Sequence, residues 1–240
     1  MSLLHIVQRL GRRCGLDIRR FHEGLNADCV HAKTLARCGI DLVLDVGANT
    51  GQFGHQLRSK YGYRGRLISF EPMAAARVEL QARAAKDPTW EVMDFGLGEV
   101  SGVETLNVSA NSQSSSLLPM DDRHIAAAPE ACYIRSEIVT IKTLDEIFPA
   151  LGTASREVFL KLDVQGYEMR VLTGARAALE KIRLVRLEMS ICPLYQSEIL
   201  IEDLIAYMRR LGFNLVAIEP NFVDPRSGAL LQVDGLFCRL

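Results

Sequence analysis

Short apolar runs alternate with amphipathic stretches along most of this 240-residue chain. The continuous apolar runs predict buried strands at residues 42–46, 67–70, 90–95, 158–164 and 184–189. Between them, apolar residues at helical spacing predict helices at about residues 50–60, 74–86, 175–182 and 198–211. Strands that alternate with helices indicate a mostly parallel sheet covered on both faces. We therefore predict a doubly wound α/β fold.

This alternation pauses between residues 98 and 157. Two strand-like pieces, 103–108 and 137–143, flank a serine-rich segment at 111–133 that shows no clear periodicity. A loop of this length inside a compact domain usually covers a site or contacts a substrate. We expect the segment 111–133 to act as such a loop.

The chain closes with two further strand-like runs, at residues 214–218 and 230–239. Their connector contains Pro220, Pro225 and Gly228, which are typical of turns. An antiparallel final pair of strands is therefore predicted.

Residues 1–40 show helical spacing and a basic character, with five arginines between residues 9 and 20. Two interpretations remain open. The segment is either a helical extension packed on the domain, or a basic amphipathic helix that makes weak contact with a membrane surface or a partner through residues 1–20. We place a helical N-terminal extension at residues 1–40 and one domain at residues 41–240.

The amino-acid composition and the net charge limit the classes of protein to which this chain can belong. Apolar residues make up 48% and charged residues 24%, as in a globular protein with a sizeable core, and the net charge is −1. This charge creates no bulk attraction to nucleic acid or to an anionic membrane. Six cysteines without metal-ligand spacing, no secretory signal pattern and no 18-residue apolar run predict a cytoplasmic protein without stable membrane insertion.

The first predicted strand runs into the turn sequence LVLDVGANTGQFG, residues 42–54. The turn lacks the second glycine of a dinucleotide fingerprint and the lysine of a phosphate loop. Asp45 would also repel a pyrophosphate at close range. Acids beside the turn suit S-adenosylmethionine, which carries an ammonium and a sulfonium. Gly47 and Gly51 would let the backbone approach this cofactor, and Asn49 would add polar contacts.

Glu71 follows the second predicted strand, 24 residues after Gly47. An acid at a similar offset binds the ribose hydroxyls of adenosine cofactors. The turn alone would be an ordinary strand–turn–helix, and Glu71 alone a surface acid. Together they favour a site for an adenosine-bearing cofactor.

The fourth and fifth predicted strands carry charges where central strands are usually apolar, namely Lys161, Asp163, Arg186 and Glu188. One interpretation is a buried ion-pair network. The other puts Asp163 and Glu188 at the mouth of a cleft, where a carboxylate could orient or deprotonate a substrate hydroxyl. Both can hold. His124 is a further candidate base. The two carboxylates could bind a divalent cation, but the sequence shows no third oxygen ligand beside them, so we predict no metal site.

The segments DVGANTGQF, SFEP, KLDVQGYEMRVLTGA and RLEMS together resemble the FkbM-type family of S-adenosylmethionine-dependent methyltransferases. The resemblance extends from about residue 41 to the end. It implies a class I methyltransferase fold, a Rossmann-like seven-stranded sheet with a reversed last strand. It also implies methylation of a hydroxyl on a sugar, glycan, glycolipid or secondary metabolite.

By position, Asp45, Gly47, Asn49 and Gly51 match the cofactor turn of that family. Glu71 matches its ribose-binding acid, and Asp94 falls near where the adenine end should lie.

Lys161, Asp163 and Gly166 match the K-x-D-x-[EQ]-G segment of the family. Gln165 stands where the family more often has glutamate, so the proposed general base moves to Asp163. The competing interpretations are a nucleotide-dependent oxidoreductase on the same sheet and a relative that binds the cofactor without turnover.

Overall fold

The computed structural model describes residues 3–16, 18, 21–153 and 156–239. Its main element is a seven-stranded sheet with the order β3-β2-β1-β7-β8-β10-β9. The strands are β1 (Leu42–Val46), β2 (Arg66–Phe70), β3 (Trp90–Met93), β7 (Val158–Leu162), β8 (Ile182–Ser190), β9 (Asn214–Val223) and β10 (Leu230–Cys238). The pairs among β3, β2, β1, β7 and β8 are parallel, whereas β10 runs antiparallel to β8 and β9. The predicted doubly wound sheet with a reversed last strand is confirmed.

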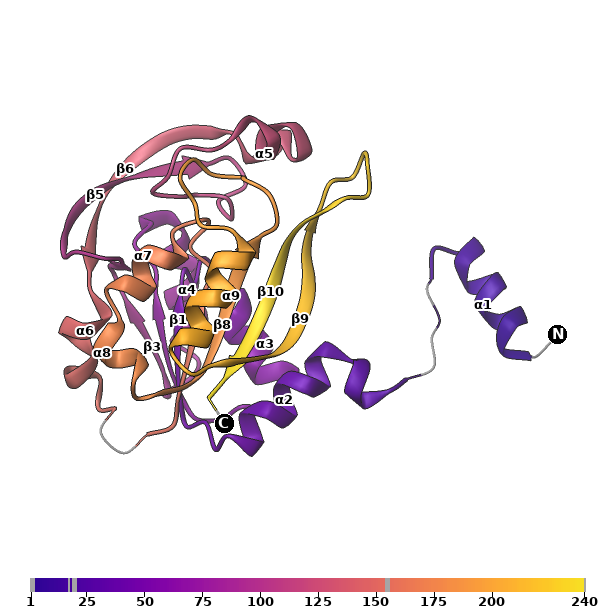
Figure 1. The fold of residues 1–240 in the computed structure, drawn as a ribbon, viewed down its shortest axis with the longest axis horizontal. Coiled ribbons are helices and arrows are strands. Elements are labelled where there is room, and N and C mark those ends of the chain that lie inside the picture. The colour runs from indigo at the N-terminus through magenta and orange to yellow at the C-terminus, as the bar shows by residue number, and fades with distance from the viewer. Residues whose placement is uncertain (1–2, 17, 19–20, 154–155, 240) are drawn as a thin grey trace.

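Helices cover both faces of this sheet (Figure 1). They are α2 (Ala27–Arg37), α3 (Gln52–Ser59), α4 (Ala74–Ala84), α6 (Leu144–Ile147), α7 (Glu168–Thr173), α8 (Arg176–Leu179) and α9 (Ile201–Arg210), with the 3-10 turns η1 (Glu23–Leu25) and η3 (Phe148–Leu151). The strand period of two divides the core. Leu42 and Leu44 pack with α6 to α9, while Val43 packs with α2, α3 and α4. The central strands are apolar on both sides because both sides are covered.

Chain order along the sheet reverses between β1 and β7. Parallel strands on either side of such a switch point send their following segments to opposite faces, which opens a crevice at their carboxyl ends. The turn after β1 and the segment after β7 both lie at this crevice.

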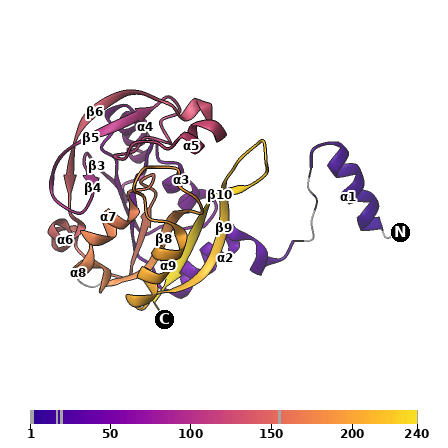
Figure 2. The ribbon, with the colours of Figure 1, turned by 45° about the horizontal axis from the view of Figure 1, so that its top comes forward.

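A second, three-stranded sheet consists of β4 (Gly96–Leu97), β6 (Tyr133–Lys142) and β5 (Gly102–Ser109). Figures 1 and 2 show β5 and β6 curving over one end of the large sheet. The segment 111–133, expected to be a loop, contains α5 (Asp122–Ala127) and the 3-10 turn η2 (Pro129–Ala131). Isolated bridges from Ser116 to Asn107 and from Met120 to Tyr195 hold it in place. This long-range pairing leaves no local pattern in the sequence.

The two N-terminal helices differ in their contacts. Helix α2 packs on the domain, with Leu35 buried in the core and His31 Nδ1 2.8 Å from Glu219 Oε1. Helix α1 (Leu3–Arg13) stands away from the rest of the molecule (Figure 1). The expected packing on the domain therefore holds for α2 and not for α1. No helix in the described part of the chain combines the length and apolar character needed to cross a bilayer.

Both edges of the large sheet are interrupted or short. Strand β3 has four residues. Strand β9 is longer than the predicted 214–218, but it includes Pro220, and its pairing with β10 shifts register at three places.

Candidate functional site

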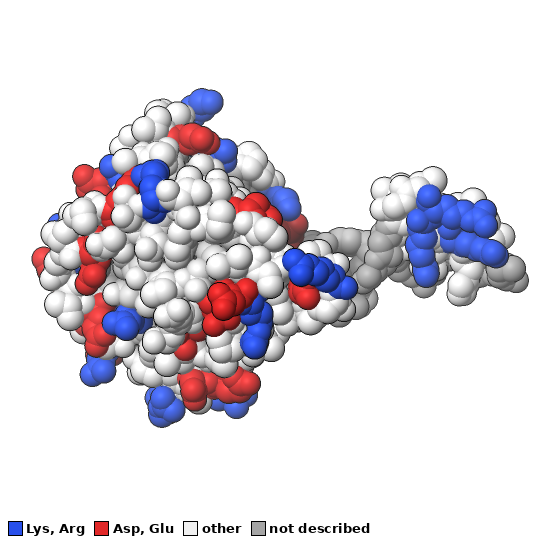
Figure 3. Space-filling view, turned by 90° about the horizontal axis from the view of Figure 1, so that it is seen from above, with Lys and Arg blue, Asp and Glu red and all other residues white. Residues whose placement is uncertain are grey.

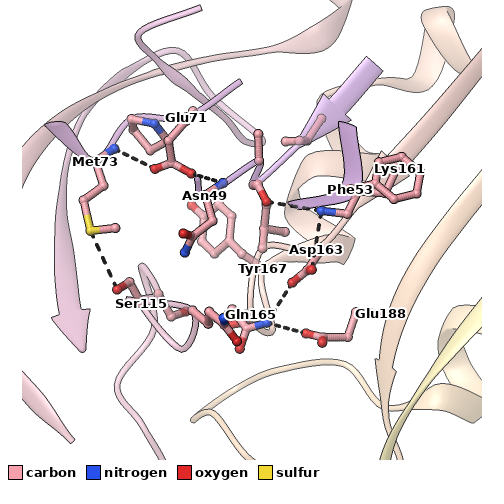
Figure 4. Close-up of a pocket in the computed structure, with 18 of the residues that line it drawn as sticks. Asn49, Phe53, Glu71, Met73, Ser115, Lys161, Asp163, Gln165, Tyr167 and Glu188 are labelled. Carbon is pink, nitrogen blue, oxygen red and sulfur yellow. Dashed lines mark hydrogen bonds and ion pairs between the residues drawn. The ribbon is translucent and has the colours of Figure 1, made fainter. Parts of the chain in front are cut away.

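A cavity of about 350 Å³ opens at the carboxyl ends of β1, β2, β7 and β8, beneath the small sheet. We call one wall the turn side, comprising Gly47, Ala48, Asn49, Glu71 and Met73. The opposite wall is the carboxylate side, comprising Asp163, Gln165, Glu188, Asn221 and Asp234. Figure 4 shows Asn49, Glu71 and Met73 facing Gln165 and Glu188 across the cavity.

Gly47 is the first residue of the turn side, and no other amino acid would fit at this position. Its φ is +73°, and a Cβ placed there would lie 1.8 Å from the carbonyl oxygen of Asp163. The backbone therefore crosses the end of β7 in direct contact, which a side chain would prevent. Asn49, with φ of +47°, continues the turn in the left-handed region that asparagine tolerates.

Glu71 closes the turn side. Its Oε2 accepts the Asn49 N–H at 2.7 Å, and its Oε1 accepts the Met73 N–H at 2.8 Å. Burial raises the pKa of this carboxyl to about 7, against the opposing effect of the two N–H donors. A turn N–H that would otherwise receive a phosphate thus already binds a carboxylate. This arrangement disfavours a pyrophosphate-bearing cofactor.

Asp45 lies behind the turn and is not among the residues that line the cavity. It is fully buried on β1, directly opposite Lys161 of β7, with 3.2 Å between its Oδ1 and Lys161 Nζ. Lys161 Nζ also donates to the Gly47 carbonyl at 3.2 Å and lies 3.4 Å from Asp163 Oδ2. Burial works against the charged lysine, but the carboxylates of Asp163 and Asp45 raise its pKa. Asp45 therefore supports the turn from below, by way of Lys161.

Two other predicted cofactor residues do not face the cavity. Gly51, with φ of +88°, packs against Leu80 and Trp90, where a Cβ would lie 2.9 Å from Leu80 Cδ1. Asp94 is exposed after β3, and the next residues of β4, Gly96 and Leu97, line the cavity at that end. The structure thus brings Gly47, Asn49 and Glu71 together, but not Gly51 and Asp94.

The carboxylate side is organised by Gln165. Its Nε2 donates to Asp163 Oδ1 and to Glu188 Oε2, both at 2.7 Å (Figure 4). Its Oε1 accepts the Tyr195 hydroxyl at 2.6 Å, which fixes the orientation of the amide. The main chain at Gln165 has φ of +56°, so the side chain reaches the two carboxylates from a left-handed turn. The two predicted catalytic carboxylates therefore form one hydrogen-bonded unit.

Glu188 is buried, with neutral amides as its hydrogen-bond donors. Asn221 Nδ2 donates to its Oε1 at 2.8 Å, opposite the bond from Gln165. Burial, followed by the neighbouring Asp163 carboxylate, raises the pKa of Glu188 well above its ordinary value. Asp163 differs, because 36% of its side chain is exposed.

The other two strand charges are structural. Lys161 joins Asp45 and Asp163, and Arg186 Nη2 lies 2.9 Å from Asp234 Oδ2 on the neighbouring strand β10. The ion pairs at Lys161 and Arg186 and the cavity-lining positions of Asp163 and Glu188 are therefore both present, and the catalytic function of the two carboxylates stays a prediction.

The structure does not bring His124 to the cavity. Its ring is buried in α5, 5.1 Å from the Tyr195 ring and 5.4 Å from the Phe222 ring. Burial lowers the pKa of this imidazole. The general-base hypothesis for His124 finds no support in this geometry, because α5 packs the ring into a small apolar cluster.

Sequence reasoning did not identify the functions of Asn221 and Tyr195. Asn221 directly follows Pro220 in an edge strand, and Tyr195 follows Pro193 and Leu194 in an irregular segment. Neither position carries a periodic or motif signal. The sequence singled out Gln165 in the K-x-D-x-[EQ]-G segment, but only as a reason to assign the general base to Asp163.

Comparisons with known proteins agree with this geometry. Residues 45–215 match the methyltransferase FkbM domain. The AMB antimetabolite synthetase AmbE of Pseudomonas aeruginosa is 31% identical over 184 residues, which cover 61% of this chain and 8% of AmbE. The matched region is therefore a small part of that relative.

Two solved methyltransferases are similar at low identity. One is the FkbM methyltransferase of Methylobacillus flagellatus KT, with 17% identity and a TM-score of 0.48 over 82% of this chain and 43% of that one. The other is magnesium protoporphyrin IX methyltransferase of Synechocystis PCC 6803 with bound S-adenosylmethionine, with 10% identity and a TM-score of 0.46. That match covers 100% of this chain and 85% of the other. Because the matching family consists of methyltransferases, the match argues against the alternative of a nucleotide-dependent oxidoreductase. The chain belongs to the FkbM family of methyltransferases, and its methyl donor is S-adenosylmethionine.

Proposed function

We propose that this methyltransferase acts on a hydroxyl oxygen of a small-molecule or glycan acceptor. The observation that carries the proposal is the hydrogen-bonded unit of Asp163, Gln165 and Glu188 at the cavity wall. A hydroxyl must lose its proton when its oxygen accepts a methyl group, and a carboxylate is a suitable proton acceptor. The partly exposed Asp163 is the proposed base, and the buried Glu188 is proposed to orient the acceptor.

The turn side is proposed to hold the methyl donor. When bound, S-adenosylmethionine supplies an electrophilic methyl group. Glu71 would hold the ribose, since the lone pairs that Asn49 and Met73 leave free can accept hydrogen bonds from its hydroxyls. Gly47 lets the main chain approach the donor, and Asn49 adds polar contacts. A cavity without a free phosphate-binding turn suits this donor better than a dinucleotide.

The reaction is fast only if the acceptor hydroxyl and the base are held in a fixed position relative to each other. Lys161 Nζ, 3.4 Å from Asp163 Oδ2, stabilises the charged carboxylate and limits its movement. Ser116 Oγ donates to the Gln165 carbonyl at 2.7 Å and so ties the segment 111–133 to the carboxylate side. We propose that this segment covers the acceptor and excludes water.

The polar groups of the carboxylate side also support a proposal for the chemical class of the acceptor. The polar groups of the carboxylate side are carboxylates and amides, and Arg186, which also lines the cavity, is paired with Asp234. Such a wall suits a molecule with several hydroxyls, as in a sugar, a glycolipid or a hydroxylated secondary metabolite. The relative AmbE is an antimetabolite synthetase, which is consistent with a secondary metabolite as the acceptor.

A radiolabelled methyl-transfer assay tests the proposal. The full chain is incubated with labelled S-adenosylmethionine and a panel of sugars, glycolipids and hydroxylated metabolites, and the position of the label is determined. We expect transfer to oxygen, with Asp163→Asn lowering turnover by about 100-fold or more while S-adenosylhomocysteine affinity stays within about threefold. Label on carbon or nitrogen, or full turnover by Asp163→Asn, would contradict it.

A further inference from the structure

Helix α1 exposes its apolar side chains to solvent. Ile6 is 44% exposed, Val7 38% and Leu10 56%. Apolar side chains grouped on one helix are normally buried against a domain, but this helix stands clear of the domain (Figures 1 and 2). The exposed face therefore lacks a covering surface in the part of the chain that the structure describes.

The charges of α1 are all of one sign. The helix contains Arg9, Arg12 and Arg13 and no acidic residue. Arg9 and Arg13 each follow an apolar residue of the exposed face by three positions, Ile6 and Leu10, so they flank that face. Figure 3 shows the basic side chains gathered on this helix, whereas acids and bases are mixed on the visible face of the domain.

This charge pattern separates positions 1–20 from the rest of the chain. They hold five of the 28 basic residues and one of the 29 acids, which leaves 23 basic and 28 acidic residues in positions 21–240. The near-neutral total therefore conceals a basic segment joined to an acidic body. An anionic surface would attract the segment and repel the body.

We propose that α1 docks on an anionic phospholipid surface, lying in the plane of the interface with Ile6, Val7 and Leu10 toward the acyl chains. At 11 residues the helix is about 16 Å long, too short to span a bilayer but sufficient to lie in its surface. Arg9 and Arg13 pair with lipid phosphates while their aliphatic stems extend along the apolar face, and Arg12, on the opposite side of the helix, adds to the positive charge near the surface.

Two other occupants fit the helix less well. A nucleic acid would use the arginines but leave the apolar face exposed to water. A second copy of the chain would offer an acidic body, yet the acidic charges visible in Figure 3 are interspersed with basic ones. A lipid surface would bury the apolar face of α1 and also supply phosphates for its arginines. This inference does not depend on which acceptor is methylated.

Sedimentation with sucrose-loaded vesicles tests the proposal on the full chain. Wild-type protein is mixed with vesicles of phosphatidylcholine alone, or with vesicles in which phosphatidylglycerol replaces part of the phosphatidylcholine. We expect binding only to the vesicles that contain phosphatidylglycerol. Arg9→Gln/Arg12→Gln/Arg13→Gln should lower the partition coefficient about 100-fold, since each arginine near an anionic surface contributes roughly fivefold.

Two further variants complete the design. Val7→Gln/Leu10→Gln keeps every charge and should also abolish binding. Arg83→Gln/Arg176→Gln/Arg209→Gln removes the same charge from exposed sites on the body and should bind as the wild type does. S-adenosylhomocysteine affinity, measured by calorimetry, should be unchanged in all three.

Wild-type protein that stays in the supernatant with the phosphatidylglycerol vesicles would overturn the proposal. So would equal loss of binding in the α1 and body arginine variants, which would indicate a general charge effect. A dimer in analytical ultracentrifugation that Val7→Gln/Leu10→Gln dissociates, without vesicle binding by the wild type, would assign the helix to self-association instead.

Discussion

The two walls of the cavity are built on different principles. The turn side consists of two short stretches, residues 47–49 and 71–73, whose shape is determined by backbone contacts, with Gly47 against β7 and two N–H groups bound to Glu71. The carboxylate side collects residues from β8, β9, β10 and the segment after β7, and side-chain hydrogen bonds link Asp163, Gln165, Glu188 and Asn221. One wall is therefore shaped by the main chain, and the other is assembled from side chains.

The sharpest test of the turn side is Gly47→Ala. The added Cβ would meet the Asp163 carbonyl at 1.8 Å, so β1 and β7 must separate. We expect a loss of more than about 4 kcal/mol in the free energy of unfolding, measured by urea denaturation. Gly62→Ala is the matched control, since Gly62 also has positive φ but meets nothing within 4 Å. It should cost only about 1–2 kcal/mol. Equal costs would show that the contact with β7 is unimportant.

Lys161 joins the two walls, and Lys161→Met separates them. Asp45 would remain buried without a charged partner, so unfolding should become easier by about 3–5 kcal/mol. Asp45→Asn/Lys161→Met should recover most of that loss, because it removes the uncompensated charge. Chemical denaturation of both variants measures the difference. A double variant as unstable as the single one would argue against the pair.

Glu71 tests whether the turn side binds ribose. Glu71→Ala should weaken S-adenosylhomocysteine binding by about 1.5–3 kcal/mol in calorimetry, since a charge-assisted hydrogen bond is lost.

The same site should make donor binding depend on pH. With a pKa of about 7, the Glu71 carboxyl of the free protein is protonated below this value and charged above it. Only the charged form accepts both ribose hydrogen bonds in full, so affinity should rise as pH increases from 6 to 8. Glu71→Gln cannot ionise and should give a flat profile. A wild-type profile that falls over this range would exclude the ribose function.

The smallest effect is expected at the carboxylate side, from Gln165→Glu. A third carboxyl between Asp163 and Glu188 replaces a donor with an acceptor, and its charge should raise the pKa of Glu188 further. Carbon-13 NMR of the side-chain carboxyls, with Glu188→Gln used for assignment, measures the change. Gln165→Met removes the donor without adding charge and should give a smaller rise. Donor affinity should stay within about twofold in both variants. An unchanged Glu188 titration in Gln165→Glu would refute the bridging function.

The contrast between the walls also explains what the sequence could predict. The positions of the strands and helices and the strand–turn–helix at residues 42–54 follow from local patterns, because each depends on residues close together along the chain. Gln165 depends instead on Tyr195, 30 positions away, and Glu188 on Asn221, 33 positions away. The sequence predicts a loop at 111–133 because the bridge from Met120 to Tyr195 has no local signature.

His124 shows how the same dependence on distant residues affects the interpretation of a single side chain. A histidine in an apparently open loop suggested a base, but α5 packs its ring against Tyr195 and Phe222. Whether a loop residue faces water or a core depends on the elements that fold back on it, and these are distant in sequence.

The edges of the large sheet have a consequence for how copies of the chain meet. An unpaired edge strand offers a row of N–H and C=O groups to which another chain can add, which is a route to aggregation. Strand β3 is only four residues long, and Pro220 removes one donor from β9 while three register shifts bend it. Replacing Pro220 with valine would return one N–H donor to this edge strand. The proline thus acts against strand-to-strand polymerisation.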